Sequence, residues 1–139
     1  MSRTLKCAVA TAVALIVIAV PAVASAASLH VTLPSKVHKG TQFKYRASGS
    51  GNFAHNYFAI FLGSAKCKKT YAAEFKAAGK PAISTFIGRS FTAKIPIRLG
   101  SVGTVWFCTY LYPKVGKGNT TWPFKPPEAK NSHKVIVTR

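Results

Sequence analysis

Carboxylates and histidines do most acid–base and metal chemistry in proteins, and this chain has few of them. Its 139 residues include two acids, Glu74 and Glu128, and four histidines. Glycoside hydrolysis in its common form needs two carboxylates about 5–10 Å apart, and we expect Glu74 to be solvated on a helix rich in Ala and Lys. A Ser-His-acid triad would need one of the same two acids, and the chain has no Gly-x-Ser-x-Gly motif. The sequence therefore predicts a protein that is not an enzyme.

The histidines do not have the spacing of metal ligands. No two of them stand at i, i+2 or i, i+4, and hard cations need carboxylates that are missing here. No Gly-rich phosphate loop of the usual spacing occurs either. We expect no metal and no cofactor, with the histidines at the surface or at strand ends: His30, His38, His55 and His133.

The N-terminal region has the three parts of a secretory signal peptide. Residues 1–6 carry two positive charges, residues 8–20 are apolar apart from one Thr, and Ala24-Ser25-Ala26 offers small residues to a signal peptidase. A spanning helix needs about 20 apolar residues, and Pro21 ends this run earlier. We expect cleavage after Ala26. The mature protein would then be one secreted domain, residues 27–139, without a transmembrane segment; a retained membrane anchor is the alternative.

Cleavage would remove Cys7 and leave Cys67 and Cys108. Two cysteines in an exported domain most often form one disulfide. The loop that this pair would close has about forty residues, for which chain entropy gives about 4 kcal/mol of stabilisation. We predict this disulfide; the alternative is a free catalytic thiol, which would need a nearby base.

The segment from Pro113 to Ser132 mixes lysines with aromatic residues and has neither helical nor strand periodicity. Loops of this length are usually functional or disordered. Exposed aromatic rings beside lysines suit sugar stacking, cation–π contacts or a polyanion. In the alternative interpretation, Trp122 and Phe124 pack beneath a loop stiffened by prolines. The candidate binding residues are Lys114, Lys117, Trp122, Phe124 and Lys125.

The charge balance is strongly basic. The chain has 20 Lys and Arg residues against two acids, and without Arg3 and Lys6 the mature net charge is +16. Such an excess favours polyanionic partners. Lysines outnumber arginines 14 to 4 in the mature chain, and Lys acts as a point charge rather than as a bidentate ligand. We therefore expect association with an anionic cell-wall polymer or an acidic polysaccharide, and only nonspecific contact with nucleic acid.

Short runs of alternating apolar residues predict an all-β domain. The clearest is Thr104–Tyr112, with Trp106 and Cys108 on one face and Phe107 on the other. Pro96 lacks a backbone donor, so its strand should lie at a sheet edge or be bulged there. Six or seven strands in about 110 residues favour a sandwich of two antiparallel sheets. The predicted strands are 29–33, 41–47, 56–62, 82–87, 90–99, 104–112 and a last one around Val135 and Val137.

One turn and one helix interrupt the strands. Gly49-Ser50-Gly51-Asn52 predicts a flexible turn. Thr70 is a suitable N-cap for a short helix from Tyr71 to Ala78, ended by Gly79. Tyr71 and Phe75 are four residues apart, so both should face the core.

This plan resembles an immunoglobulin-like (Ig-like) β-sandwich, and more narrowly the small exported Ig-like domains of uncharacterised bacterial proteins. The resemblance covers residues 29–138. It rests on Leu-His-Val-Thr-Leu-Pro from residue 29, Gly-Thr-Gln-Phe-Lys-Tyr from residue 40 and Trp-Phe-Cys-Thr-Tyr-Leu-Tyr from residue 106, which is similar to an F strand. Antibody-type domains place the first cysteine on the second strand, whereas Cys67 follows the third. The resemblance implies the architecture and no specific partner.

Together these features predict a secreted, noncatalytic Ig-like binding or adhesion module that associates electrostatically with anionic surface polymers. Two other classes stay open. One is a purely structural exported domain without a dedicated ligand, and the other is a cationic membrane-active protein, although the chain has no long basic amphipathic helix.

Overall fold

The computed structural model describes residues 26–116 and 118–139. The predicted signal peptide up to Ser25 lies outside this range, as does Lys117. Among the described residues no helix is long and apolar enough to cross a membrane. The elements, in chain order, are β1 (Ser28–Thr32), β2 (Lys36–His38), β3 (Gln42–Gly63), α1 (Tyr71–Ala78), β4 (Ile83–Arg98), β5 (Gly103–Pro113), the 3-10 helix η1 (Trp122–Phe124) and β6 (Ala129–Thr138).

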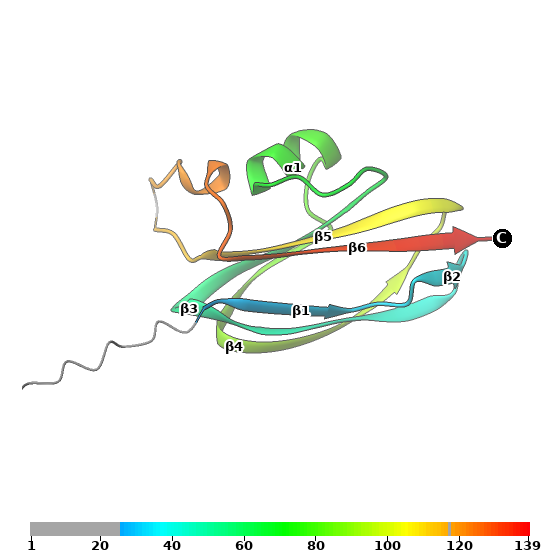
Figure 1. Cartoon of the computed structure of the whole chain (residues 1–139), viewed down its shortest axis with the longest axis horizontal. Helices are drawn as coiled ribbons and strands as arrows, with labels where there is room; N and C mark the ends of the chain where they lie inside the picture. Colours follow the sequence, from blue (N-terminus) through cyan, green and yellow to red (C-terminus); the bar gives the residue numbers. More distant parts are fainter. Residues whose placement is uncertain (1–25, 117) are drawn as a thin grey trace, which may run out of the picture.

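Two long strands, β3 and β4, run through both layers of a sandwich (Figure 1). Residues 42–50 of β3 pair with β1 and with residues 90–98 of β4, forming one layer. Residues 55–63 of β3 pair with β5 and residues 83–88 of β4, and β6 and β2 extend this second layer. A register shift between Ser50 and His55 marks the passage of β3 from one layer to the other.

The predicted turn at residues 49–52 is wrong, because these residues lie inside β3. Its glycines permit close packing instead of chain reversal. A Cβ on Gly49 would collide with the backbone carbonyl of Ser28, and one on Gly51 would collide with the side chain of Asn56. Glycine within a strand commonly marks such an approach.

Strand pairing differs from the sequence prediction in two further ways. The strands predicted at 82–87 and 90–99 form the single strand β4, and β2 pairs with β6 in parallel, so the sandwich is not wholly antiparallel. The prediction for Pro96 is confirmed: it lies on β4, which pairs only with β3 among the described strands and is therefore an edge strand.

The alternation predicted for β5 divides the apolar residues into two clusters. Phe107 and Leu111 face the other layer and pack with Tyr45, Phe58 and Val135. The opposite face of β5 carries a second cluster, formed by Cys108, Tyr110 and Tyr112 with Ala59 and Phe61. α1 and η1 lie side by side over this outer face (Figure 1).

The helix α1 has the predicted bounds and caps. The Thr70 hydroxyl oxygen accepts a hydrogen bond from the Ala73 amide, and Gly79 ends the helix with a φ of 81°. Tyr71 packs against the outer cluster as expected. Phe75 does not face the core, because 43% of its surface is exposed.

Candidate functional site

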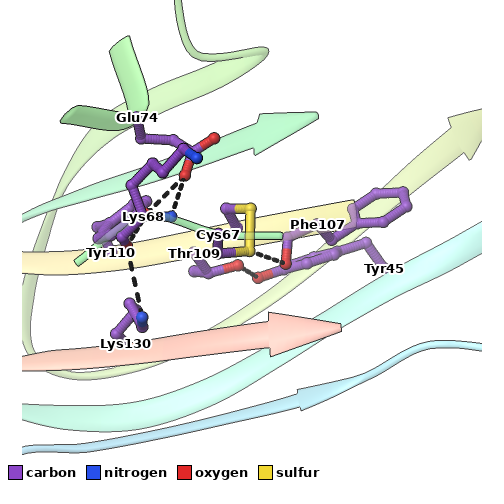
Figure 2. The surroundings of a disulfide bond; sticks show 9 residues. Tyr45, Cys67, Lys68, Glu74, Phe107, Thr109, Tyr110 and Lys130 are labelled. Atoms are coloured by element: carbon purple, nitrogen blue, oxygen red, sulfur yellow. Dashed lines mark hydrogen bonds between the residues drawn. A yellow bond between two sulfur atoms is a disulfide. The ribbon is translucent and has the colours of Figure 1, made fainter. Parts of the chain in front are cut away.

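The disulfide between Cys67 and Cys108 is present, with Cα atoms 5.4 Å apart (Figure 2). Cys108 is fully buried on the outer face of β5, and Cys67 belongs to the connection that precedes α1. The bridge therefore fastens this connection to the sheet and fixes where α1 begins.

Glu74 is the main correction to the predicted chemistry. We expected a solvated side chain, but Glu74 is only 2% exposed. Its Oε2 accepts hydrogen bonds from the Lys68 amide at 2.6 Å and from the Tyr110 hydroxyl at 2.9 Å (Figure 2). Burial raises the pKa of Tyr110, and the hydrogen bond to Glu74 raises it further. The Glu74 carboxylate thus has a structural role: it holds the connection before α1 against β5.

The same region brings three potential metal ligands together. The sulfurs of Cys67 and Cys108 and a carboxylate oxygen of Glu74 all lie within 4.8 Å of one another. Because the sulfurs are bonded to each other, they are not available as the thiolates that a metal would need.

A continuous row of aromatic rings crosses the outer face of the molecule. The successive distances between ring centroids are 6.2 Å from Phe75 to Tyr71, 4.8 Å from Tyr71 to Trp122, 5.4 Å from Trp122 to Tyr57 and 5.6 Å from Tyr57 to Phe86. We call these five residues the aromatic row. Its two ends are exposed to solvent, since Phe86 is 60% and Phe75 is 43% exposed.

The structure brings some of the predicted binding residues to this row. Trp122 is half-buried at its centre, as in the packed interpretation of the loop, whereas Phe124 is 73% exposed. The Lys114 ammonium lies 5.3 Å from the centroid of the Phe86 ring, a cation–π contact. Lys125 is exposed and its carbonyl accepts a hydrogen bond from Tyr112. Lys117 lies outside the described residues.

Sequence reasoning missed the other members of the row. Tyr57 and Phe86 come from β3 and β4, and Tyr71 and Phe75 come from α1, far from the loop in sequence. The available signals were local: the i, i+4 spacing of Tyr71 and Phe75, and the position of Phe86 in a strand. Neither signal says that these residues meet Trp122.

Two grooves lie on either side of Trp122. The first, between α1 and η1, has a volume of about 450 Å³ and is lined by Tyr71, Phe75, Trp122, Pro123 and Phe124, together with Ala72 and Lys76. We call it the α1–η1 groove. The second has a volume of about 400 Å³ and is lined by Tyr57, Phe86, Val115, Gly116, Gly118, Asn119 and Trp122.

Neither acid of the described chain presents its carboxylate to solvent. Glu74 is buried, and both carboxylate oxygens of Glu128 are enclosed without a hydrogen-bond partner. Burial raises the pKa of Glu128, an effect that the nearby backbone amide of Asn52 partly opposes. All thirteen described lysines and all four described arginines are exposed. The surface of residues 26–116 and 118–139 is therefore cationic without exposed acidic side chains.

Comparison with family models and with curated protein sequences gives no match. The CARDB domain of a protein from Pyrococcus furiosus, solved by NMR, is similar in structure, with a TM-score of 0.54 and 8% identity over 81% of this chain and 94% of that one. A crystal structure of this domain in complex with di-metal ions gives a TM-score of 0.50 and 10% identity over 81% and 89%.

A C. elegans member of the MSP family also matches, with a TM-score of 0.45 and 11% identity over 82% of this chain and 99% of that one. At such identities the two CARDB comparisons bear on the fold alone. The strand order and the similarity to the CARDB domain together establish that the chain is an immunoglobulin-like β-sandwich.

Proposed function

We propose that this protein is an exported, noncatalytic binding module that associates with anionic polymers at the cell surface. The observation that carries the proposal is the complete burial of the acidic groups. Both carboxylates are enclosed while every described lysine and arginine is exposed. No exposed acidic side chain of the described chain competes with an external polyanion for these cations.

The distribution of charge supports long-range attraction. Exposed basic residues occur on both layers, such as Lys44 and Lys94 on one and Lys130 and Lys134 on the other. A field of one sign raises the local concentration of an oppositely charged partner and its association rate. The disulfide suits a protein that works in an oxidising environment.

The proposal is tested by retention on immobilised polymers. The protein should bind cell wall, acidic polysaccharide and DNA at low salt and should not bind a neutral glycan. At about 0.5 M salt the Debye length falls to about 4 Å, so retention should largely disappear. Retention that survives this salt, or equal retention on the neutral glycan, would contradict an electrostatic mode of binding.

Charge variants show whether part of the surface dominates. Lys114→Gln with Lys125→Gln removes two charges beside the aromatic row, and Lys44→Gln with Lys94→Gln removes two from the opposite layer. A generic field predicts the same loss of retention in both double variants. A larger loss in the first would place the polymer on the loop face, where the sequence located the candidate binding residues.

A further inference from the structure

The α1–η1 groove is an apolar depression that is open to solvent on the outer face of the sheet. Tyr71, Trp122 and Pro123 line it, and Phe75 and Phe124 flank it with 43% and 73% of their surfaces exposed. Large exposed apolar side chains that lie together are uncommon on a soluble domain and usually mark an interaction surface.

The chemistry of the groove favours an apolar occupant. Among the lining side chains, only Tyr71, Trp122 and Lys76 carry a polar atom. The Tyr71 hydroxyl lies 3.4 Å from the hydroxyl of Tyr57, within the aromatic row. Recognition of a sugar depends on several well-placed hydrogen-bonding groups, which this groove does not supply. An apolar chain next to an anionic group matches its walls and its lysine.

Lys76 lines the groove, and further exposed lysines precede or follow α1 and η1 along the chain. Lys68 and Lys69 precede α1, Lys76 is in its last turn and Lys80 follows it. The one acid of α1, Glu74, points to the sheet and is buried. Lys125 directly follows η1 and is exposed. Lys68, whose carbonyl lies 3.4 Å from the Lys130 ammonium (Figure 2), lines a different hollow with Ala77 and Ala78 of α1.

We propose that the α1–η1 groove docks on the surface of an anionic lipid bilayer. Phe75 and Phe124 enter the boundary between headgroups and acyl chains, and Lys76 and Lys125 lie at the level of the lipid phosphates. Helices that lie at such interfaces combine Phe or Trp on one face with Lys beside them, and each lysine near an anionic surface raises membrane partition about fivefold.

A second copy of this chain fits the groove less well than a bilayer does. A symmetric contact would bring Lys76 of one groove towards Lys76 of the other copy. No exposed acidic side chain of the described chain is available to pair with it. This inference goes beyond the proposed binding of polymers, which needs no groove.

The test is binding to phosphatidylcholine vesicles with and without phosphatidylglycerol. We would use protein recovered from the medium of an exporting host, so that all variants share one N-terminus, checked by mass spectrometry. The Phe75→Ala, Phe124→Ala double variant should bind phosphatidylglycerol vesicles about tenfold more weakly. Phe53→Ala removes another exposed Phe, 52% exposed on β3, and should change binding less than about twofold.

Tryptophan emission gives a second readout that does not depend on affinity. Trp106 and Trp122 are the two tryptophans of the chain, so Trp106→Phe leaves Trp122 alone to report. Its emission should shift to shorter wavelength with phosphatidylglycerol vesicles and should be quenched by brominated acyl chains. Circular dichroism of each variant verifies that it is folded.

Several results would overturn the inference. They are absence of binding, equal binding to neutral vesicles, or unchanged binding of the Phe75→Ala, Phe124→Ala variant. A loss of polysaccharide retention in this variant, with vesicle binding intact, would make the groove a glycan site instead. If polymer retention is normal and vesicle binding is absent, the inference fails and the proposed function stands. If vesicle binding is normal and polymer retention is absent, the proposed function fails and the inference stands.

Discussion

At the scale of single residues, the two acids are the most informative side chains of this molecule. Glu74 is buried with two hydrogen-bond donors, whereas the enclosed oxygens of Glu128 have no partner within hydrogen-bonding geometry. A buried carboxylate that is well hydrogen-bonded supports the fold, and one that is poorly bonded weakens it when ionised. The same residue type should therefore have opposite effects at these two positions.

Glu74→Ala should destabilise the protein by about 2–3 kcal/mol, because it leaves the Lys68 amide and the Tyr110 hydroxyl without their buried acceptor. Glu74→Gln is the matched control, because its amide oxygen can still accept both hydrogen bonds. The loss of stability in this variant should therefore be smaller. Urea unfolding measures both. Equal losses in the two variants would show that the charge, and not the acceptor, matters.

Glu128 should make the stability of the protein depend on pH. Its pKa is raised in the fold, so the folded state binds the proton more tightly than the unfolded state does. Its contribution to stability is present below the ordinary pKa of a glutamate and is lost as pH rises through the raised value. Glu128→Gln should thus stabilise the protein at neutral pH and have little effect at acid pH. Thermal unfolding across this range would refute the assignment if the difference grew as the pH fell.

At the scale of elements, the connection before α1 depends on links to β5 rather than on its own structure. The disulfide, Glu74 and the contact of the Tyr112 hydroxyl with the Tyr71 amide at 2.9 Å join the helix region to one strand. An eight-residue helix is too short to be stable alone in water. α1 and the groove that it borders therefore exist because β5 holds them in place.

Replacing both cysteines tests this dependence. Cys67→Ser with Cys108→Ser should lower the free energy of unfolding by about 4 kcal/mol, the chain-entropy value for a loop of this size. Hydrogen exchange should quicken most in α1, and more than in β6, which the disulfide does not touch. A uniform increase in exchange would mean that α1 is not separately dependent on the bridge.

At the scale of the whole molecule, the sandwich separates two kinds of surface. The layer that contains β1 displays dispersed charge, such as Lys44 and Lys94. The outer face of the other layer carries the aromatic row, and α1 and η1 lie over this face (Figure 1). The net charge of +16 on residues 27–139 opposes compaction by self-repulsion, so salt should stabilise the fold while it weakens polymer retention. A melting temperature that falls with moderate salt would contradict this view of the charge.

The sequence by itself determined the features that depend on local pattern. Alternation in Thr104–Tyr112 predicted a strand with two apolar faces, the caps at Thr70 and Gly79 predicted α1, and two cysteines in a chain expected to be exported predicted their disulfide. Strand periodicity and helix caps act over a few residues, so the sequence can display them. The basic surface is also a property of composition.

Only the tertiary structure decided how distant segments meet. The pairing of β1 with β3 brings Gly49 against the Ser28 backbone, and the aromatic row requires α1, β3, β4 and η1 to converge. Likewise, Glu74 is buried because β5 presents Tyr110 beneath it. Local propensity is silent on these contacts, because they join residues tens of positions apart and their free energy depends on packing that exists only in the folded chain.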